Sequence, residues 1–316
     1  MFNIIGKRYW YFLISALLIV PGLIAMVYST VTYGSPVRMS IDFTGGSLIV
    51  LKFQQPATED AIRNVFMSYG FTNPTVQRLG KPEDNTWQVR VGFTDLETVD
   101  KIKASLTDQV GPIDETSSSF NTIGPAVGHE VTRSATVAVA IASLLVGAFI
   151  IVTFRRVPNA LRYGVSAISA MVHDILVALG FVSIMGLLFN WEVDSLFLTA
   201  ILTVIGFSVQ DKIVVFDRIR ENTPKRRGEP YETIVNRSIL EVIQRSLTTQ
   251  LNAMFVMIAI LLFGGASIKQ FIAVMLVGMV TATYSSIFNA VPVLVVWEKG
   301  EIGQFFRRLR RREAPA

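Results

Sequence analysis

The sequence predicts an α-helical polytopic membrane protein with six transmembrane helices and one extracytoplasmic α+β domain of the ferredoxin-like type. Hydrophobic residues make up 51% of the 316 residues and charged residues only 17%, whereas an average soluble protein has about 25% charged residues. The mean hydropathy is +0.47. The apolar residues gather in long runs, and a single hydrophilic segment of roughly 100 residues separates the first two runs.

The predicted spans are the runs of about 20 predominantly apolar residues, the length that crosses a bilayer as a helix. An aromatic segment, Tyr9-Trp10-Tyr11, enters the first run and is typical of a membrane interface. A signal peptide is the alternative for this run, but no small-residue cleavage site follows it. The six spans are residues 11–29, 134–154, 163–189, 195–216, 247–263 and 271–297.

The distribution of lysine and arginine predicts the orientation. These residues gather before the first span, after the second, between the fourth and fifth, and at the end of the chain. The loops 190–194 and 264–270 together contain one lysine, Lys269, and no arginine. The positive-inside rule therefore places both termini in the cytoplasm. The segments between spans are a cytoplasmic N-terminus (1–10), an extracytoplasmic domain (30–133), a cytoplasmic loop with an amphipathic surface helix (217–246) and a basic cytoplasmic tail (298–316). We expect the tail to meet membrane lipids and not nucleic acid.

Within residues 30–133, strand and helix patterns alternate. Residues 47–53 and 87–93 are predicted strands, residues 75–79 form a weaker one, and residues 115–122 form a polar one. Helices are expected over residues 58–69 and from a capping box that opens at Thr94 and contains Glu97. The resulting order, βαββαβ, matches the ferredoxin-like unit.

Several classes of chemical site are excluded. The chain has no cysteine, so it has no disulfide, thiolate metal site or cysteine nucleophile. Its two histidines, His129 and His173, are far apart in sequence and cannot supply a histidine-rich metal site. Neither of the glycine fingerprints that bind nucleotide phosphates is present. We therefore expect no enzyme activity, no catalytic residue, no metal and no cofactor.

Ionisable residues inside two predicted spans are the strongest functional signal. His173 and Asp174 lie in the third span, and Asp211 and Lys212 lie in the fourth. A charge at the bilayer centre costs about 2.5–3.5 kcal/mol on insertion scales, and it usually marks function. A carboxylate there could bind and release a proton during a transport cycle. His173 could relay that proton or donate to a backbone carbonyl, and Lys212 is expected to extend to the cytoplasmic interface.

Uncharged polar residues accompany these charges. At 1.5 Å per residue, Asp211 and Asn252 lie about 8 Å from the cytoplasmic ends of their spans, Asn289 about 12 Å and Asp174 about 16 Å. The structural alternative for such a layer is hydrogen bonding and close packing between helices. The expected intramembrane polar layer comprises Ser208, Thr248, Thr249, Asn252, Ser285 (or Ser286) and Asn289.

The segment Asp42-Phe43-Thr44-Gly45-Gly46 follows the first span. Its glycines permit positive φ, and Asp42 can cap a backbone group, so an ordinary turn is one interpretation. The other is a hinge that lets the outer domain swing relative to the membrane.

At these residues the chain resembles the SecF family of protein-export membrane proteins, within the SecD/SecF group of the resistance–nodulation–division superfamily. The likeness extends over nearly the whole chain. It is carried by Asp42–Gly46, His173-Asp174, residues 206–222 (GFSVQDKIVVFDRIREN), Arg245-Ser246 with Thr248-Thr249, Gly264-Gly265 and Tyr284-Ser285-Ser286.

The resemblance implies a subunit that pairs with SecD and assists the Sec translocation channel. Such a unit uses the proton-motive force, or a sodium gradient in some relatives, for late-stage translocation of unfolded preproteins. The resemblance also implies that Asp211 is the ion-responsive carboxylate and Arg245 its membrane-edge arginine. The expected ion-coupling residues are Asp211, Arg245, Asp174 and His173.

The sequence departs from the family pattern at two positions, and two other functions are possible interpretations. Gln210 and Lys212 stand where the family more often has Asn and Thr, which bears on the choice of ion. An exporter of lipids or small molecules from the same superfamily is one alternative, although a single short half argues against it. A passive assembly factor is the other, and the acidic group in the fourth span argues against that.

Overall fold

The chain folds into two compact units. The membrane unit contains Met1–Arg38 and Val137–Ala316, and the α+β unit contains Met39–Thr136. The structure, a computed structural model, describes residues 3–71, 74–80, 82–155 and 159–301. Most of the predicted basic tail, residues 302–316, lies outside the described residues.

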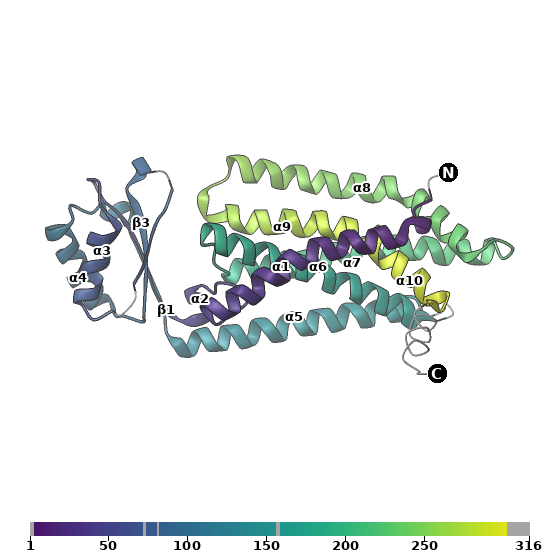
Figure 1. Ribbon diagram of the computed structural model, residues 1–316, viewed down its shortest axis with the longest axis horizontal. Coiled ribbons are helices and arrows are strands. Elements are labelled where there is room, and N and C mark those ends of the chain that lie inside the picture. Colours follow the sequence, from purple (N-terminus) through teal and green to yellow (C-terminus); the bar gives the residue numbers. More distant parts are fainter. Residues whose placement is uncertain (1–2, 72–73, 81, 156–158, 302–316) are drawn as a thin grey trace, which may run out of the picture. The chain divides into compact units, whose positions relative to one another are not determined.

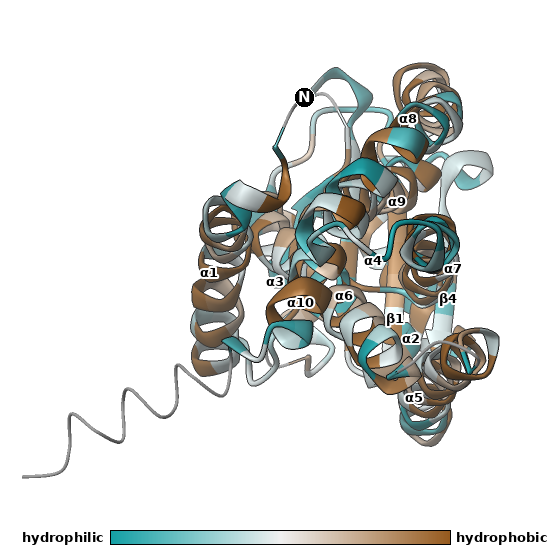
Figure 2. Ribbon diagram, turned by 90° about the vertical axis from the view of Figure 1, so that its right-hand side faces the viewer, coloured by the Kyte–Doolittle hydropathy of each residue, from teal (hydrophilic) through white to brown (hydrophobic). Residues whose placement is uncertain are grey.

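Among the described residues, six helices are long and apolar enough to cross a membrane. Figure 1 shows them as long rods, and α1 is predominantly apolar along its length in Figure 2. The predicted fold class of a polytopic helical membrane protein is confirmed. The helices are α1 (Arg8–Tyr33), α5 (Pro125–Thr153), α6 (Ala160–Phe189), α7 (Ser195–Lys225), α8 (Tyr231–Phe263), and α9 (Ala266–Ser285), which continues through a π-helical turn η4 (Ser286–Ala290) into α10 (Val291–Glu298).

The N-terminal segment and the end of α10 lie together. Before α1, the short helix η1 (Ile5–Lys7) receives a cap from α8, because Asn236 Oδ1 accepts from Ile4 N at 2.7 Å. Arg8 donates to Glu301 at 2.6 Å and to Glu232 at 3.0 Å. Ion pairs and a cap thus tie three distant parts of the sequence into one end of the bundle.

The start of α8 differs from the expectation. An amphipathic helix on the membrane surface was predicted up to residue 246, separate from the next span. Instead α8 runs unbroken from Tyr231 to Phe263. Its apolar strip, which includes Val235, Ile239 and Val242, packs into the same buried cluster as α6 and α7. Burial against the bundle therefore takes the place of burial in lipid headgroups.

Helices α1 and α6 cross at two glycines. A Cβ built on Gly180 would lie 2.7 Å from the Cα of Gly22, and no real Cβ approaches that closely. Small residues at such a crossing let two membrane helices approach until their backbones touch.

We expect Gly180→Ala to destabilise the chain by about 1–3 kcal/mol, the usual effect of overpacking a close contact. Gly206→Ala is the matched control, because a Cβ at Gly206 on α7 meets nothing within 4 Å. That control should be neutral or slightly stabilising, since alanine favours helices over glycine. Thermal unfolding of the two variants in detergent measures the difference, and equal midpoints would contradict the crossing.

The α+β unit has the predicted ferredoxin-like topology. Its sheet order is β2-β3-β1-β4, with every neighbouring pair antiparallel. One face is covered by α3 and α4, whose apolar side chains share a buried core with Trp87, Val89 and Leu51. The elements are β1 (Gly46–Lys52), α3 (Glu59–Ser68), β2 (Thr75–Arg78), β3 (Thr86–Val91), α4 (Leu96–Gln109) and β4 (Ser119–Ile123), with short helices α2 (Ile41–Thr44), η2 (Pro82–Asp84) and η3 (Glu115–Ser117).

Two details of this unit differ from the sequence pattern. The N-cap of α4 is Asp95 and not Thr94, because Asp95 accepts from Thr98 N at 3.2 Å. Hydrogen bonding from Thr98 lowers the pKa of the Asp95 carboxyl. Thr94 is buried and its N–H donates to Ser47 Oγ at 3.1 Å. The predicted strand over residues 115–122 begins only at Ser119, since Glu115–Ser117 forms the turn η3.

Candidate functional site

Asp174, near the middle of α6, collects hydrogen bonds from two other helices. Its Oδ2 accepts from Ser208 Oγ of α7 at 2.6 Å and from Ser285 Oγ of α9 at 2.7 Å. Lys212 Nζ of α7 lies 3.1 Å from the same oxygen. Ser208 and Lys212 face Asp174 together because residues four apart lie on one side of a helix. Asp174, Ser208, Lys212, Ser285 and His173 are named the polar cluster below.

Lys212 forms a fully buried ion pair with Asp174. The two side chains are 0% and 1% exposed. The ammonium is also bonded to Ser208, through the backbone oxygen at 3.3 Å and through the hydroxyl. The expectation that Lys212 extends to the membrane interface is therefore wrong. In a low-dielectric interior a carboxylate and two further oxygens hold an ammonium in place of water.

His173 continues the polar cluster toward α1. Its Nδ1 lies 3.1 Å from Asp174 Oδ1, while its Nε2 is buried and has no hydrogen-bond partner among the described residues. If Nδ1 carries the proton that faces the carboxylate, a neutral ring leaves Nε2 as a free acceptor. The ring lies 6.2 Å from that of Tyr284, whose hydroxyl donates to Tyr11 O at 2.7 Å. The alternative bond from His173 to a backbone carbonyl is not present among the described residues, and the relay role stays a prediction.

Asp211 lies outside the polar cluster. It is 4% exposed, and it accepts from Gln250 Nε2 of α8 at 2.9 Å. One residue along a helix is a rotation of about 100°, so Lys212 faces α6 while Asp211 faces α8. Gln250 is a partner that the sequence analysis did not select, although it lies between the selected Thr249 and Asn252.

The other residues of the expected polar layer separate into two groups. Ser208 and Ser285 are in the polar cluster, and Asn289 is buried in η4. Arg245, Thr248, Thr249 and Asn252 are exposed on α8. The two threonine hydroxyls donate to backbone oxygens one turn earlier, at 2.8 and 2.9 Å. The structure thus brings α6, α7 and α9 together through polar groups, and α8 joins them through Gln250.

The π-helical turn η4 begins directly after Ser285. Such turns are rare and often occur at functional sites. Here the turn follows Ser285, which donates to Asp174, so the polar cluster adjoins the irregular part of this helix.

Asp42–Gly46 forms a packed corner of the α+β unit. Ser40 caps α2 by accepting from Asp42 N at 3.1 Å. Gly45 and Gly46 have φ values of +71° and +122°, which glycine adopts readily. A Cβ on Gly45 would lie 2.7 Å from Pro125 Cα, and one on Gly46 would lie 2.9 Å from Val91 O. Bending at this motif would have to change close backbone approaches on two sides, and the hinge interpretation stays a prediction.

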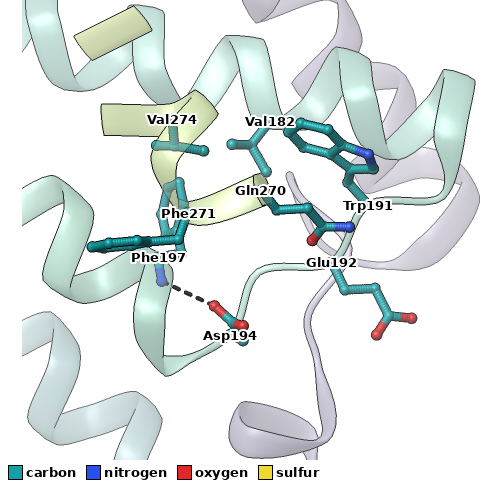
Figure 3. A pocket seen from close by; sticks show the side chains of 8 residues that line it. All are labelled: Val182, Trp191, Glu192, Asp194, Phe197, Gln270, Phe271 and Val274. Carbon is teal, nitrogen blue, oxygen red and sulfur yellow. Dashed lines mark hydrogen bonds between the residues drawn. The ribbon is translucent and has the colours of Figure 1, made fainter. Parts of the chain in front are cut away.

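A shallow cleft at the loop between α6 and α7 is separate from the polar cluster. Figure 3 shows Asp194, the N-cap of α7, which accepts from Phe197 N at 2.9 Å. The cleft is lined by Val182, Trp191, Glu192, Asp194, Phe197, Gln270, Phe271 and Val274.

Two family models match the chain. Residues 102–300 match the model described as protein export membrane protein SecD/SecF, C-terminal. Residues 32–57 match the SecD/SecF GG motif, and this stretch includes Asp42–Gly46. The first match contains every residue of the polar cluster.

Full-length relatives and a solved structure give the same likeness. The protein translocase subunit SecF of Anaerolinea thermophila is 46% identical over 98% of both chains. That of Thermobaculum terrenum is 41% identical, also over 98% of both. The SecDF of Bacillus subtilis is 32% identical over 94% of this chain and 38% of its own. The crystal structure of SecDF from Thermus thermophilus, a translocon-associated membrane protein, matches with a TM-score of 0.77 at 27% identity, over 94% of this chain and 39% of that one.

Proposed function

Because the chain belongs to the SecD/SecF family and is a SecF-type translocase subunit, we propose that it couples an ion gradient to late-stage export of preproteins. In this proposal it pairs with a SecD-like subunit beside the Sec channel in a bacterial inner membrane. Relatives in which both subunits form one chain support the pairing, since this chain covers 38% and 39% of two SecDF proteins. The proton is the proposed ion, and sodium is the alternative.

The observation that carries the proposal is the buried pair of Asp174 and Lys212. Two charges buried at 1% and 0% exposure are a poor way to stabilise a bundle, because desolvation offsets most of their attraction. They are well suited to a switch. Neutralising Asp174 would release Lys212 and weaken the bonds from Ser208 and Ser285, so the packing of α6, α7 and α9 would change together.

Asp211 supplies a second carboxylate within the bundle. Its bond from Gln250 couples α7 to α8, just as the polar cluster couples α7 to α6 and α9. A cycle in which the two carboxylates differ in charge would move α7 against all three neighbours. His173 Nε2, buried and without a partner among the described residues, is the proposed point at which a proton enters the polar cluster.

Inverted membrane vesicles provide the test of this function. Vesicles that contain this chain and a SecD-like subunit should complete late translocation faster with a gradient than after an ionophore has collapsed it. A protonophore and a sodium ionophore, applied separately, identify the ion. Gradient stimulation equal to that of vesicles lacking the chain would reject the proposal.

We predict that the α+β unit and the α7–α8 connection lie on opposite sides of the membrane. Because the chain has no native cysteine, single cysteines at Ser117 and Gly228, both exposed, report without background. In intact cells an impermeant thiol reagent should label Ser117→Cys and leave Gly228→Cys unlabelled until the membrane is opened. Labelling of Gly228→Cys from outside would reverse the orientation.

A further inference from the structure

The two edges of the sheet in the α+β unit are unlike. At the β2 edge, Pro74 precedes the strand and Arg78 ends it, with its guanidinium 4.7 Å from the ring centre of Trp87. Proline and charge are the usual devices that keep a sheet edge from pairing with another chain. The β4 edge has neither. Residues 116–123 (TSSSFNTI) contain no charge and no proline.

The register shows which backbone groups of β4 point away from the sheet. On β1, Phe53 N donates to Asn85 O beside β3, whereas Lys52 O accepts from Asp114 N on the β4 side. Successive residues of a strand direct their backbone groups to opposite sides, so Leu48 and Val50 also face β4. The β4 partners of Gly46, Leu48 and Val50 are Ile123, Asn121 and Ser119. The N–H and C=O groups of Phe120 and Thr122 therefore point outward.

Nothing in the described part of the chain pairs with this outward row. β4 has one neighbour in the sheet, β1, and no backbone hydrogen bond from outside that ladder reaches it. Ser119, Asn121 and Thr122 are exposed, while Phe120 packs against the core of the unit and holds the strand in place. Among the described residues, the outward backbone groups of β4 are therefore unpaired.

We infer that the β4 edge binds an extended segment of unfolded polypeptide by strand addition. This inference rests on the proposed function in export. Pairing through main-chain groups does not depend on side-chain sequence, which suits a translocase whose substrates differ in sequence. The short, uncharged side chains of β4 repel neither basic nor acidic segments. Two outward residues offer only a few hydrogen bonds, so the polypeptide is held weakly and can move on.

Photo-crosslinking of the full chain in lipid nanodiscs tests the inference. A benzoylphenylalanine is placed at Ser119 on the β4 edge or, as the matched control, at Gln77 on the β2 edge. The probe is reduced and alkylated α-lactalbumin, which stays unfolded. We expect adducts with the probe from position 119 and not from position 77. Equal yields at both positions, or adducts from position 119 only with a second copy of the chain or with a SecD-like subunit, would overturn the inference.

Two substitutions at Thr122 distinguish the contribution of its outward backbone N–H to binding from that of its side chain. Thr122→Pro removes that N–H, whereas Thr122→Val keeps it and loses the hydroxyl bonded to Ser47 Oγ at 2.9 Å. We expect Thr122→Pro to bind the probe roughly tenfold more weakly, the effect of losing a hydrogen bond, and Thr122→Val to bind like the parent chain. If Thr122→Pro does not fold, Asn121→Lys adds an edge charge without touching the backbone and should weaken binding likewise.

The outcomes distinguish the two proposals. Binding of the probe is measured without any ion gradient. If the adducts form but the gradient does not stimulate export in vesicles, strand addition at β4 would stand and the coupling of export to an ion gradient would be rejected. Gradient-stimulated export without adducts, or with equal adducts in Thr122→Pro and Thr122→Val, would reject strand addition and leave the coupling intact.

Discussion

Lys212→Met is expected to destabilise the chain by about 3–5 kcal/mol, the usual result of removing one partner of a buried ion pair. Methionine fills much of the space of the lysine stem but leaves the Asp174 carboxylate buried at 1% exposure without its cation. The hydroxyls of Ser208 and Ser285 still donate to that carboxylate, at 2.6 and 2.7 Å, and cannot neutralise it. Unfolding in detergent, followed by tryptophan fluorescence, measures the loss.

A double-mutant cycle gives the control. Asp174→Asn alone leaves the Lys212 ammonium buried beside an uncharged amide, so it should also destabilise. The combination of Asp174→Asn with Lys212→Met removes both charges and should recover most of the stability, because an uncharged pair escapes the desolvation cost. The double variant should nevertheless lose its share of gradient-driven export. An unfolding midpoint of Lys212→Met equal to that of the parent chain would contradict a buried ion pair between Lys212 and Asp174.

The membrane spans and the ferredoxin-like order were predictable because each depends on a local pattern. An apolar run of about 20 residues has few alternatives to a membrane helix. Strand alternation and helix periodicity fixed the order of elements in residues 30–133. The ends of the elements were less predictable. The first part of α8 is apolar on one face. Whether lipid or the helix bundle covers that face depends on residues distant in sequence, among them Phe216 and Leu294.

The sequence predicts the level of each polar residue along its helix, but it does not predict which neighbouring helix the side chain faces. Asp174, Ser208 and Ser285 were expected in one layer, and the structure joins them within 2.7 Å. Which of Asp211 and Lys212 would face Asp174 could not be decided, because a rotation of α7 by about 100° exchanges them. The same uncertainty about helix rotation explains why Gln250 was overlooked and why the selected Thr248, Thr249 and Asn252 are exposed.

Asp211→Asn is expected to abolish the gradient-dependent part of export while the chain folds and inserts normally. Asparagine has the shape of aspartate, and its amide oxygen can still accept from Gln250 Nε2, which donates to Asp211 at 2.9 Å. The variant cannot change charge, so a step that requires Asp211 to gain or lose a proton stops. Export that does not depend on the gradient should continue, because the substitution removes only the step in which Asp211 changes charge.

Two comparisons make the Asp211→Asn result specific. Asp217→Asn is the matched control on the same helix, since its exposed carboxylate is 2.5 Å from Arg220 and faces away from the bundle interior. It should keep full stimulation by the gradient. Asp174→Asn should lose a smaller part than Asp211→Asn, because His173 beside it can still take up a proton. Late-stage translocation is measured in inverted vesicles with and without the ionophore. Full gradient stimulation in Asp211→Asn vesicles would show that Asp211 only joins α7 to α8 through Gln250, and the coupling would then have to operate through Asp174 and Lys212 alone.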